Sequence, residues 1–416
     1  MSRHRILPCV STAGSNLVPA PGPDASAYHA VGLADRAMAL VDETSSVGFE
    51  ATVVLRGNLD EAALGEAWDR LAVLHPIISC VRAEGAWRPA GRPELGPAVR
   101  QPTHEEPPVG LRVTATEDGV RLTMLCNHVA FDGVASVRLL GDLRDEYNSV
   151  LSGAPARPPD WSPRTLEAQG VEIDWRTSIA AVVRGASTWW RTPPSTHVDP
   201  GPISDLPAEH HALMEFGPVL DALTPTRRRY HWSVDAVLVG VLEKAWSEVF
   251  GPPLAESSWL VARDLRPMLG TTRGIGNLSG ALGVSIPDPA SDLMTVIDTA
   301  EAALASQSRV LATAAVSLQR WRPAADVSFA QMLHRGRKMR AYRSVSNVGQ
   351  LGESLDQWGS ASLHRVWFVG PLAHPPYNSF IAAGHGDSTL VSVRTSGAWL
   401  TESHARALER AALGLV

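Results

Sequence analysis

One short segment, Asn127-His128-Val129-Ala130-Phe131-Asp132-Gly133, combines the residue types that a proton-transfer reaction requires. A neutral imidazole accepts a proton from an attacking alcohol or amine, and general base catalysis of this kind contributes ~10²–10⁴ in rate. His128 is therefore our candidate general base. We expect Asp132 to turn away from the reacting cleft into an ion pair with an arginine that fixes the loop. Gly133 is expected to allow a sharp turn at a helix start, where backbone N–H groups can polarise a carbonyl oxygen.

Spacing alone leaves a purely structural interpretation of this segment open. In that interpretation His128 is a hydrogen-bonded histidine at the end of a strand, and Asp132 is the N-cap of the helix that follows. The two interpretations predict the same local structure, so the segment alone does not distinguish them.

The sequence on both sides predicts a strand, a loop and a helix. Two β-rich runs, 111–116 and 120–126, are joined through Asp118-Gly119, a dipeptide that favours the positive φ angles of a tight hairpin turn. Beyond the segment, apolar residues recur at helical spacing over 134–151. His128 is therefore expected on a loop between a strand end and a helix start, where a rigid frame commonly holds reactive side chains.

The remaining elements occur in mixed order. Period-two alternation predicts a strand over 49–55, and Asp60 is expected to cap the helix after it. Further strands are predicted at 257–262, 280–286, 344–348, 363–369, 379–383 and 389–394, with helices at 233–249, 291–313, 327–341 and 401–414. This order favours α/β or α+β lobes built on sheets.

The chain of 416 residues is longer than one small core can organise, and two lobes are the simplest expectation. Proline-rich segments at 152–165 and 192–207 indicate where the lobes meet. We expect an N-terminal lobe over 1–192, which carries the His128 segment, and a C-terminal lobe over 193–416.

Composition excludes several classes of function. The net charge of −6 arises from 43 acidic and 37 basic residues without a basic block, so nucleic acid and anionic membranes are poor partners. Three cysteines at wide spacing form neither a disulfide framework nor a four-thiolate zinc site. His210-His211 lacks a third metal ligand nearby, and we interpret the pair as surface residues of a linker. No apolar run approaches the ~20 residues of a membrane span, and we expect a cytoplasmic protein.

The pattern His-x-x-x-Asp-Gly, placed after a hairpin about a third of the way along the chain, resembles the chloramphenicol-acetyltransferase-like superfamily. This superfamily includes condensation domains of nonribosomal peptide synthetases, polyketide-associated acyltransferases and wax ester synthases. Other segments are similar to it in the same order: 71–82, which contains His75-Pro76; 261–267, followed by Gly276-Asn277; Ser346-Asn347-Val348-Gly349; and a closing hairpin over 378–393.

The resemblance implies a pseudo-dimer of two acyltransferase-like lobes with an active-site tunnel between them. His128 would be the base, Asp132 the structural acid, Gly133 the tight turn and Arg266 the ion-pair partner of Asp132. Asn127, Ser346 and Asn347 would lie along the tunnel. The donor would be an acyl-CoA or a phosphopantetheinyl carrier protein and the acceptor a small-molecule alcohol or amine, with no metal or other cofactor. We expect a free-standing, monomeric acyltransferase of specialised metabolism.

The resemblance is incomplete at the position before His128. Condensation domains and wax ester synthases usually carry a second histidine there, whereas this chain has Asn127. The late Asp-Phe-Gly-Trp-Gly segment of plant-type acyltransferases is also missing. Two alternatives therefore stay open: a catalytically silent relative that recruits a carrier or partner protein, and the same fold redirected to cyclisation, epimerisation or dehydration.

Overall fold

A computed structural model describes residues 30–42, 47–83, 85–103, 105–165, 211–251, 256–267, 274–306, 343–352, 355–371, 378–395 and 402–416. The elements before residue 166 are α2 (Leu33–Asp42), β1 (Gly48–Arg56), α3 (Glu61–Leu74), β2 (Cys80–Ala83), β3 (Ala86–Pro89), β4 (Leu95–Gly96), β5 (Val109–Ala115), β6 (Gly119–Asn127) and α4 (Gly133–Leu151). Those after residue 210 are β7 (His211–Glu215), α6 (Gly217–Tyr230), α7 (Val234–Phe250), β8 (Ser257–Asp264), β9 (Ser279–Ile286), β10 (Arg343–Gln350), β11 (Gln357–Trp358), β12 (Ala361–Val369), β13 (Asn378–His385), β14 (Ser388–Thr395) and α10 (Glu402–Leu413).

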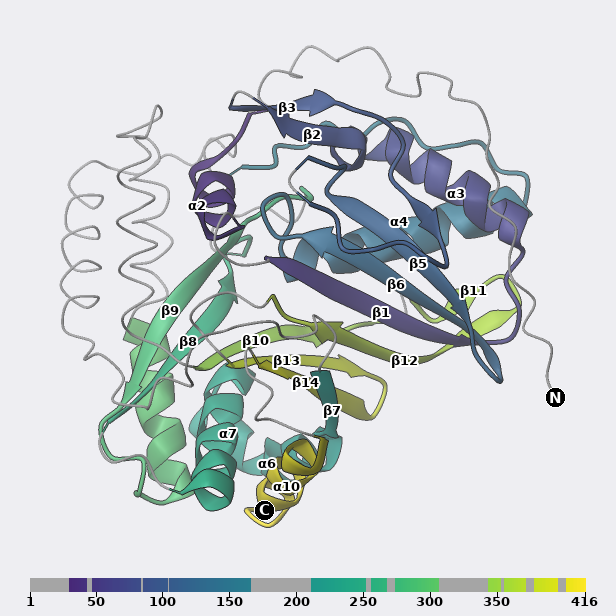
Figure 1. The fold of residues 1–416 in the computed structure, drawn as a ribbon. Coiled ribbons are helices and arrows are strands. Elements are labelled where there is room, and N and C mark those ends of the chain that lie inside the picture. The colour runs from purple at the N-terminus through teal and green to yellow at the C-terminus, as the bar shows by residue number, and fades with distance from the viewer. Residues whose placement is uncertain are drawn as a thin grey trace.

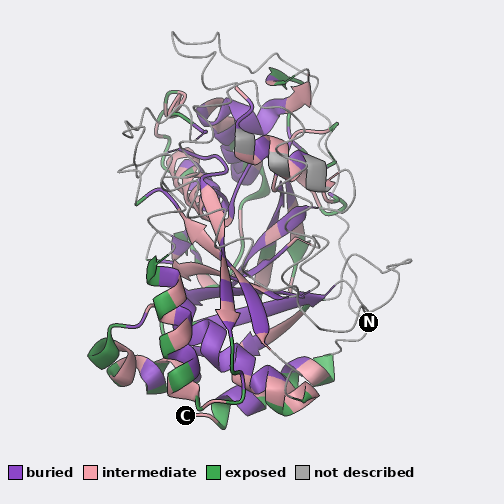
Figure 2. Ribbon diagram, turned by 90° about the vertical axis from the view of Figure 1, so that its left-hand side faces the viewer, coloured by how far each residue is buried: buried purple, intermediate pink, exposed green. Residues whose placement is uncertain are grey.

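Two six-stranded sheets organise these elements. The first has the strand order β11-β12-β1-β6-β5-β4, and the second has the order β7-β14-β13-β10-β8-β9. Helices α3 and α4 lie against one face of the first sheet, and α6, α7 and α10 lie against the second (Figure 1). Figure 2 shows buried residues along the strands of both sheets and exposed residues on the outer turns of the helices. The expected α/β class with two sheet-based halves is confirmed.

The first sheet follows from the periodicity of the sequence. In β1 the alternate residues Ala51, Val53 and Leu55 are fully buried, as expected for a strand whose one face packs on helices. The Asp60 carboxylate then caps α3 by accepting a hydrogen bond from the Ala63 amide at 2.9 Å. Both predictions, the strand and its capped helix, are confirmed.

The β5–β6 hairpin and helix α4 form as predicted, but the turn does not use the positive φ angles expected of Asp118-Gly119. Gly119 is instead the first residue of β6, where an added Cβ would lie 2.1 Å from the Leu55 carbonyl oxygen. The two strands pair in antiparallel register, and the Thr116 amide bonds the Gly119 carbonyl at 2.9 Å across the turn. Strand β6 ends at Asn127 and α4 begins at Gly133, so five residues, including His128, connect a buried strand to a helix.

In the second half, the predicted strands correspond to β8, β9, β10, β12, β13 and β14, and the predicted terminal helix corresponds to α10. Helix α7 is buried on nearly all sides, as its apolar sequence indicates. The helix predicted over 291–313 is described over 293–306, and the helix predicted over 327–341 lies outside the described residues.

The second half of the chain contributes strands to the first sheet. Strand β12, far along the chain, pairs antiparallel with β1 from Glu50↔Val369 to Arg56↔Ser362, and β11 pairs with β12. Strands β13 and β14 of the second sheet lie against β12. The expected division at residue 192 stays a prediction, because residues 166–210 lie outside the described part, but the second half clearly contributes two strands to the first sheet.

Sequence patterns missed several short strands. The pair β2–β3 and the two-residue strands β4 and β11 are too short for a periodic signal. The interpretation of His211 as a linker residue is wrong, because His211 opens β7, which pairs with β14 at the edge of the second sheet. The His211 side chain is exposed, and His210 lies outside the described residues.

The described elements include no helix that is long and apolar enough to cross a membrane.

Burial should make two of the three cysteines unreactive. Burial raises the pKa of the Cys80 thiol to about 11, with a smaller opposing effect from Arg164, and it raises the pKa of Cys126 far above its usual range. The thiolate is the nucleophile, so a native Cys9→Ser variant at pH 8 is expected to react only slowly with Ellman's reagent. In denaturant, both Cys80 and Cys126 should be labelled. Rapid labelling of the native variant would contradict this burial.

Candidate active site

The structure holds His128 by its backbone, from segments of both halves of the chain. The His128 amide bonds the Val47 carbonyl at 3.2 Å, and its carbonyl oxygen accepts a hydrogen bond from the Asn277 side chain at 3.0 Å. The imidazole packs edge-on against Phe49, with 5.3 Å between ring centroids, and the residue is partly exposed. A fixed backbone in a partly exposed residue suits a general base, and because Nδ1 of the ring is buried, Nε2 is the candidate basic atom.

The Asp132 carboxylate points into the protein. It forms a bidentate ion pair with Arg266, with distances of 2.9 and 3.1 Å from the two terminal nitrogens to the two oxygens. It also accepts hydrogen bonds from the backbone amides of Ala135 and Leu278, each at 2.8 Å. The structure thus contains the ion pair that we expected with Arg266, and Asp132 is also the N-cap of α4.

Arg266 organises the loop that faces the His128 segment. Besides Asp132, its guanidinium contacts Asp264 at 2.9 Å and the Gly276 carbonyl at 3.0 Å. Burial opposes the charged form of Arg266, but Asp132 and Asp264 outweigh it, so the pKa of Arg266 is raised. This charge network fixes residues 274–278 against the start of α4.

The described residues contain no group of three or more histidine, cysteine or acidic side chains that could hold a metal ion.

No protein-family model matches the chain, and neither does any curated protein sequence. Solved structures do match. Polyketide synthase associated protein 5 from Mycobacterium tuberculosis has a TM-score of 0.64 and 17% identity, covering 92% of this chain and 97% of that one. Trichothecene 15-O-acetyltransferase from Fusarium sporotrichioides has a TM-score of 0.67 and 10% identity, covering 93% and 94%. The epimerization domain from the third module of tyrocidine synthetase B has a TM-score of 0.58 and 16% identity, covering 92% and 93%.

Condensation domains also match, one of them in complex with C8-CoA. The chain has the chloramphenicol-acetyltransferase-like fold. At these low identities the similarity establishes the architecture of both halves, and the roles of individual residues rest on the geometry of this chain alone.

Asn127, the residue before His128, is buried and bonded at both ends of its amide. Its oxygen accepts a hydrogen bond from the Val129 amide at 2.9 Å, and its nitrogen donates to Asp42 at 3.3 Å. Asp42 also accepts a hydrogen bond from the Val47 amide at 3.2 Å. The structure places Asn127 under the loop that carries His128, where it is suited to support that loop.

The role expected for Gly133 needs correction. Gly133 is absent from the described glycines with positive φ, and a Cβ added there would meet only the Val348 side chain, at an ordinary contact distance of 3.6 Å. The turn therefore does not require glycine. Its missing side chain instead leaves the space between the first turn of α4 and β10 unfilled.

The structure places Ser346 and Asn347 on the part of β10 that approaches α4. Strand β10 pairs with β8 only as far as Val345, and beyond that point the two strands diverge. The Asn347 side chain accepts a hydrogen bond from the Gly349 amide at 2.9 Å, and Val348 lies next to Gly133. Direct contact of Ser346 or Asn347 with a substrate stays a prediction.

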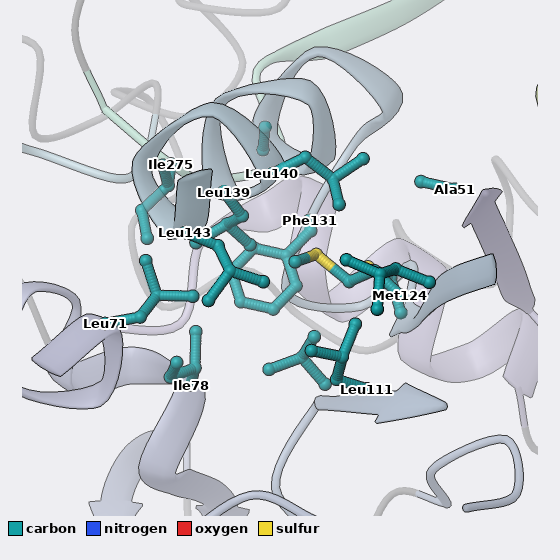
Figure 3. Packing of buried hydrophobic residues seen from close by; sticks show 14 of the residues in the cluster. Ala51, Leu71, Ile78, Leu111, Met124, Phe131, Leu139, Leu140, Leu143 and Ile275 are labelled. Atoms are coloured by element: carbon teal, nitrogen blue, oxygen red, sulfur yellow. The ribbon is translucent and has the colours of Figure 1, made fainter. Parts of the chain in front are cut away.

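Sequence reasoning missed the residue that anchors the segment in the core. Phe131 is fully buried, and Figure 3 shows its ring surrounded by apolar side chains of α3, α4 and the first sheet, with Ile275 from the loop before β9 beside them. An aromatic residue between a histidine and an aspartate gave a usable signal, because burying such a ring fixes the loop on either side of it.

Arg164 was also missed. It is almost fully buried and donates hydrogen bonds to the Ala130 carbonyl at 3.2 Å and to the Ile275 carbonyl at 3.3 Å. Its guanidinium lies over the Trp87 ring, 5.4 Å from the ring centroid. It thus joins the His128 segment to the 274–278 loop, and nothing in its local sequence indicates this.

A test of this loop is the variant Gly276→Ala. A Cβ at Gly276 would lie 1.9 Å from the backbone oxygen of Arg164, so the loop must shift. We expect the free energy of unfolding to fall by about 1–3 kcal/mol, measured by urea denaturation. A matched Gly352→Ala variant, where no atom lies within 4 Å of the added carbon, should stay within about 0.5 kcal/mol of the wild type. Equal stability of the two variants would contradict the close contact.

Proposed function

We propose that the chain is an acyltransferase of specialised metabolism. It transfers an acyl group from a CoA or carrier-protein thioester to a hydroxyl or amine acceptor. The observation that carries this proposal is the partly exposed residue His128, whose backbone is held by Val47 from one half of the chain and by Asn277 from the other. Similar structures that include an O-acetyltransferase and a condensation domain in complex with C8-CoA support it.

In the proposed reaction, neutral His128 takes the proton from the acceptor as its oxygen or nitrogen attacks the thioester carbonyl. A carbon–oxygen or carbon–nitrogen bond forms and gives a tetrahedral oxyanion, which backbone amides near a helix start would stabilise. The carbon–sulfur bond then breaks, and the leaving thiolate receives the proton from His128. The base returns to its neutral form, and no metal or redox partner enters the balance.

The other residues of the site would act through position. Asp132 and Arg266 hold the start of α4 against the 274–278 loop, and Asn127 supports the loop under His128. We assign Ser346 and Asn347 to the wall of the substrate path, because β10 separates from β8 at this point.

A second candidate is a redirected proton transfer, since the chain is also similar to an epimerization domain. One positioned base serves both reactions: in epimerisation His128 would remove a proton from a carbon next to the thioester carbonyl. The same fold with a silent site would only bind a carrier or partner protein.

One experiment separates these functions. Purified wild-type protein is given a panel of acyl-CoA and acyl-carrier donors with pooled alcohol and amine acceptors, and products are detected by intact mass. Acyl transfer yields new esters or amides. Epimerisation yields none, but in deuterium oxide it adds one mass unit to the donor acyl group. If neither signal is found and the chain binds a carrier protein tightly, the chain is a recruiting protein rather than the proposed enzyme.

A further inference from the structure

A groove of about 860 Å³ lies at the end of the first sheet away from His128. It is lined by Arg121 near the start of β6, and the seven residues from there to His128 span roughly 23 Å at ~3.3 Å per residue. The opposite wall comes from β7, β14 and the start of α10. A ligand in this groove would be too far from His128 to react there.

Three arginines share the sheet face that forms one wall of the groove. Val54 of β1 pairs with Arg121 on one side and with Arg365 on the other, and residues paired across strands point to the same face. Arg56 lies two positions beyond Val54, again on that face. All three arginines are exposed and line the groove.

These guanidinium groups lack carboxylate partners. Within the described residues no ion pair involves Arg56, Arg121 or Arg365, whereas other arginines there, such as Arg70 and Arg92, are paired with acids. Arg121 lies over a tryptophan ring of the groove floor at 5.7 Å, and Arg56 contacts only the His364 ring, at 3.3 Å. Three like charges on one face repel one another, which an anionic ligand would relieve.

The other charged groups of the groove do not cancel this arrangement. Glu402 is paired with Arg406 on α10, and Glu117 and Asp118 lie at the tip of the β5–β6 hairpin. The pKa of His364 is lowered by partial burial and then by its arginine neighbours, against a smaller effect of Asp118. The side chains that line the groove thus include four arginines against three carboxylates, a small excess of positive charge.

We propose that this groove binds a small phosphate-bearing anion, at a second site separate from His128. Guanidinium groups bind phosphate oxygens in bidentate geometry, and the groove volume falls within the range of about 300–1,000 Å³ typical of small-ligand sites. The phosphate belongs either to the nucleotide end of an extended donor or to a separate metabolite, and both present the same chemistry to the three arginines.

Binding is measured by calorimetry with adenosine 3′,5′-bisphosphate and with pyrophosphate, without turnover, so the result does not depend on the proposed acyl transfer. The double variant Arg121→Gln/Arg365→Gln should bind at least about tenfold more weakly than wild type, and high salt should weaken wild-type binding. The matched control Arg228→Gln/Arg229→Gln removes the same charge from the end of α6 and should bind like wild type. Glu117→Gln should bind more tightly.

The proposed phosphate site would be overturned if the wild type gives no heat with either probe, or if the two double variants bind the probes equally. Once binding is established, the source of the phosphate follows from kinetics. If KM rises in Arg121→Gln/Arg365→Gln for an acyl-CoA but not for the matching acyl-pantetheine, the groove takes the nucleotide end of the donor. An unchanged KM for both donors supports a separate metabolite.

Discussion

Replacing Asp132 with alanine is expected to lower the free energy of unfolding by about 3–5 kcal/mol, because it leaves the buried Arg266 charge without its partner. Both side chains are almost fully inaccessible, so water cannot replace the lost carboxylate. The backbone amides of Ala135 and Leu278 lose their acceptor in the same step. Urea denaturation followed by circular dichroism measures the change.

The matched control is Asp264→Ala, which removes the more exposed carboxylate from the same arginine. Water screens that pair, so a loss of about 1 kcal/mol or less is expected. The double variant Asp132→Leu/Arg266→Met should lose less than the sum of its single variants, since no unpaired charge remains buried. Additive losses, or equal effects of the two single aspartate changes, would rule out the ion pair as the main link between these segments.

Periodicity predicted the strands and helices that build each sheet, because a strand or helix with one buried face carries that face in its sequence. It did not predict which strands pair. Strand β12 pairs with β1 more than 300 residues earlier, and nothing in the alternation of 361–369 distinguishes this partner from a nearer one. The crossing of β11 and β12 into the first sheet is a property of long-range packing.

The candidate site also has a part that local sequence predicted and a part that depends on long-range packing. The local part, in which β6 delivers His128 and α4 starts after Asp132, followed from the hairpin dipeptide and from helical spacing. The partner Arg266, 134 residues away, was expected only from the family resemblance. Arg164 was not expected at all, since a buried arginine on a proline-rich loop looks like any exposed arginine in sequence. Its role becomes visible only when the two carbonyl groups it joins are brought together.

These connections imply that His128 is positioned by backbone contacts and by neighbouring buried residues, while the residue stays partly exposed. A variant that removes only the ring should therefore separate chemistry from folding. The ring's edge-on contact with Phe49 contributes about 0.5–1.5 kcal/mol, so His128→Ala should remain folded. Its amide and carbonyl bonds to Val47 and Asn277 do not involve the side chain.

On the donor and acceptor found for the wild type, His128→Ala is expected to lower kcat by about 10²–10⁴, the contribution of a positioned general base. KM should change much less, because the proposed base acts on the proton of the attacking group rather than on substrate affinity. Added imidazole should restore part of the rate in the variant, an effect that a purely structural histidine would not show. The matched His404→Ala change on α10 should leave kcat within about twofold of wild type, as expected for a site outside the chemistry. A His128→Ala protein with wild-type kcat would remove this imidazole from the mechanism and leave the helix start and its buried ion pair as a structural element only.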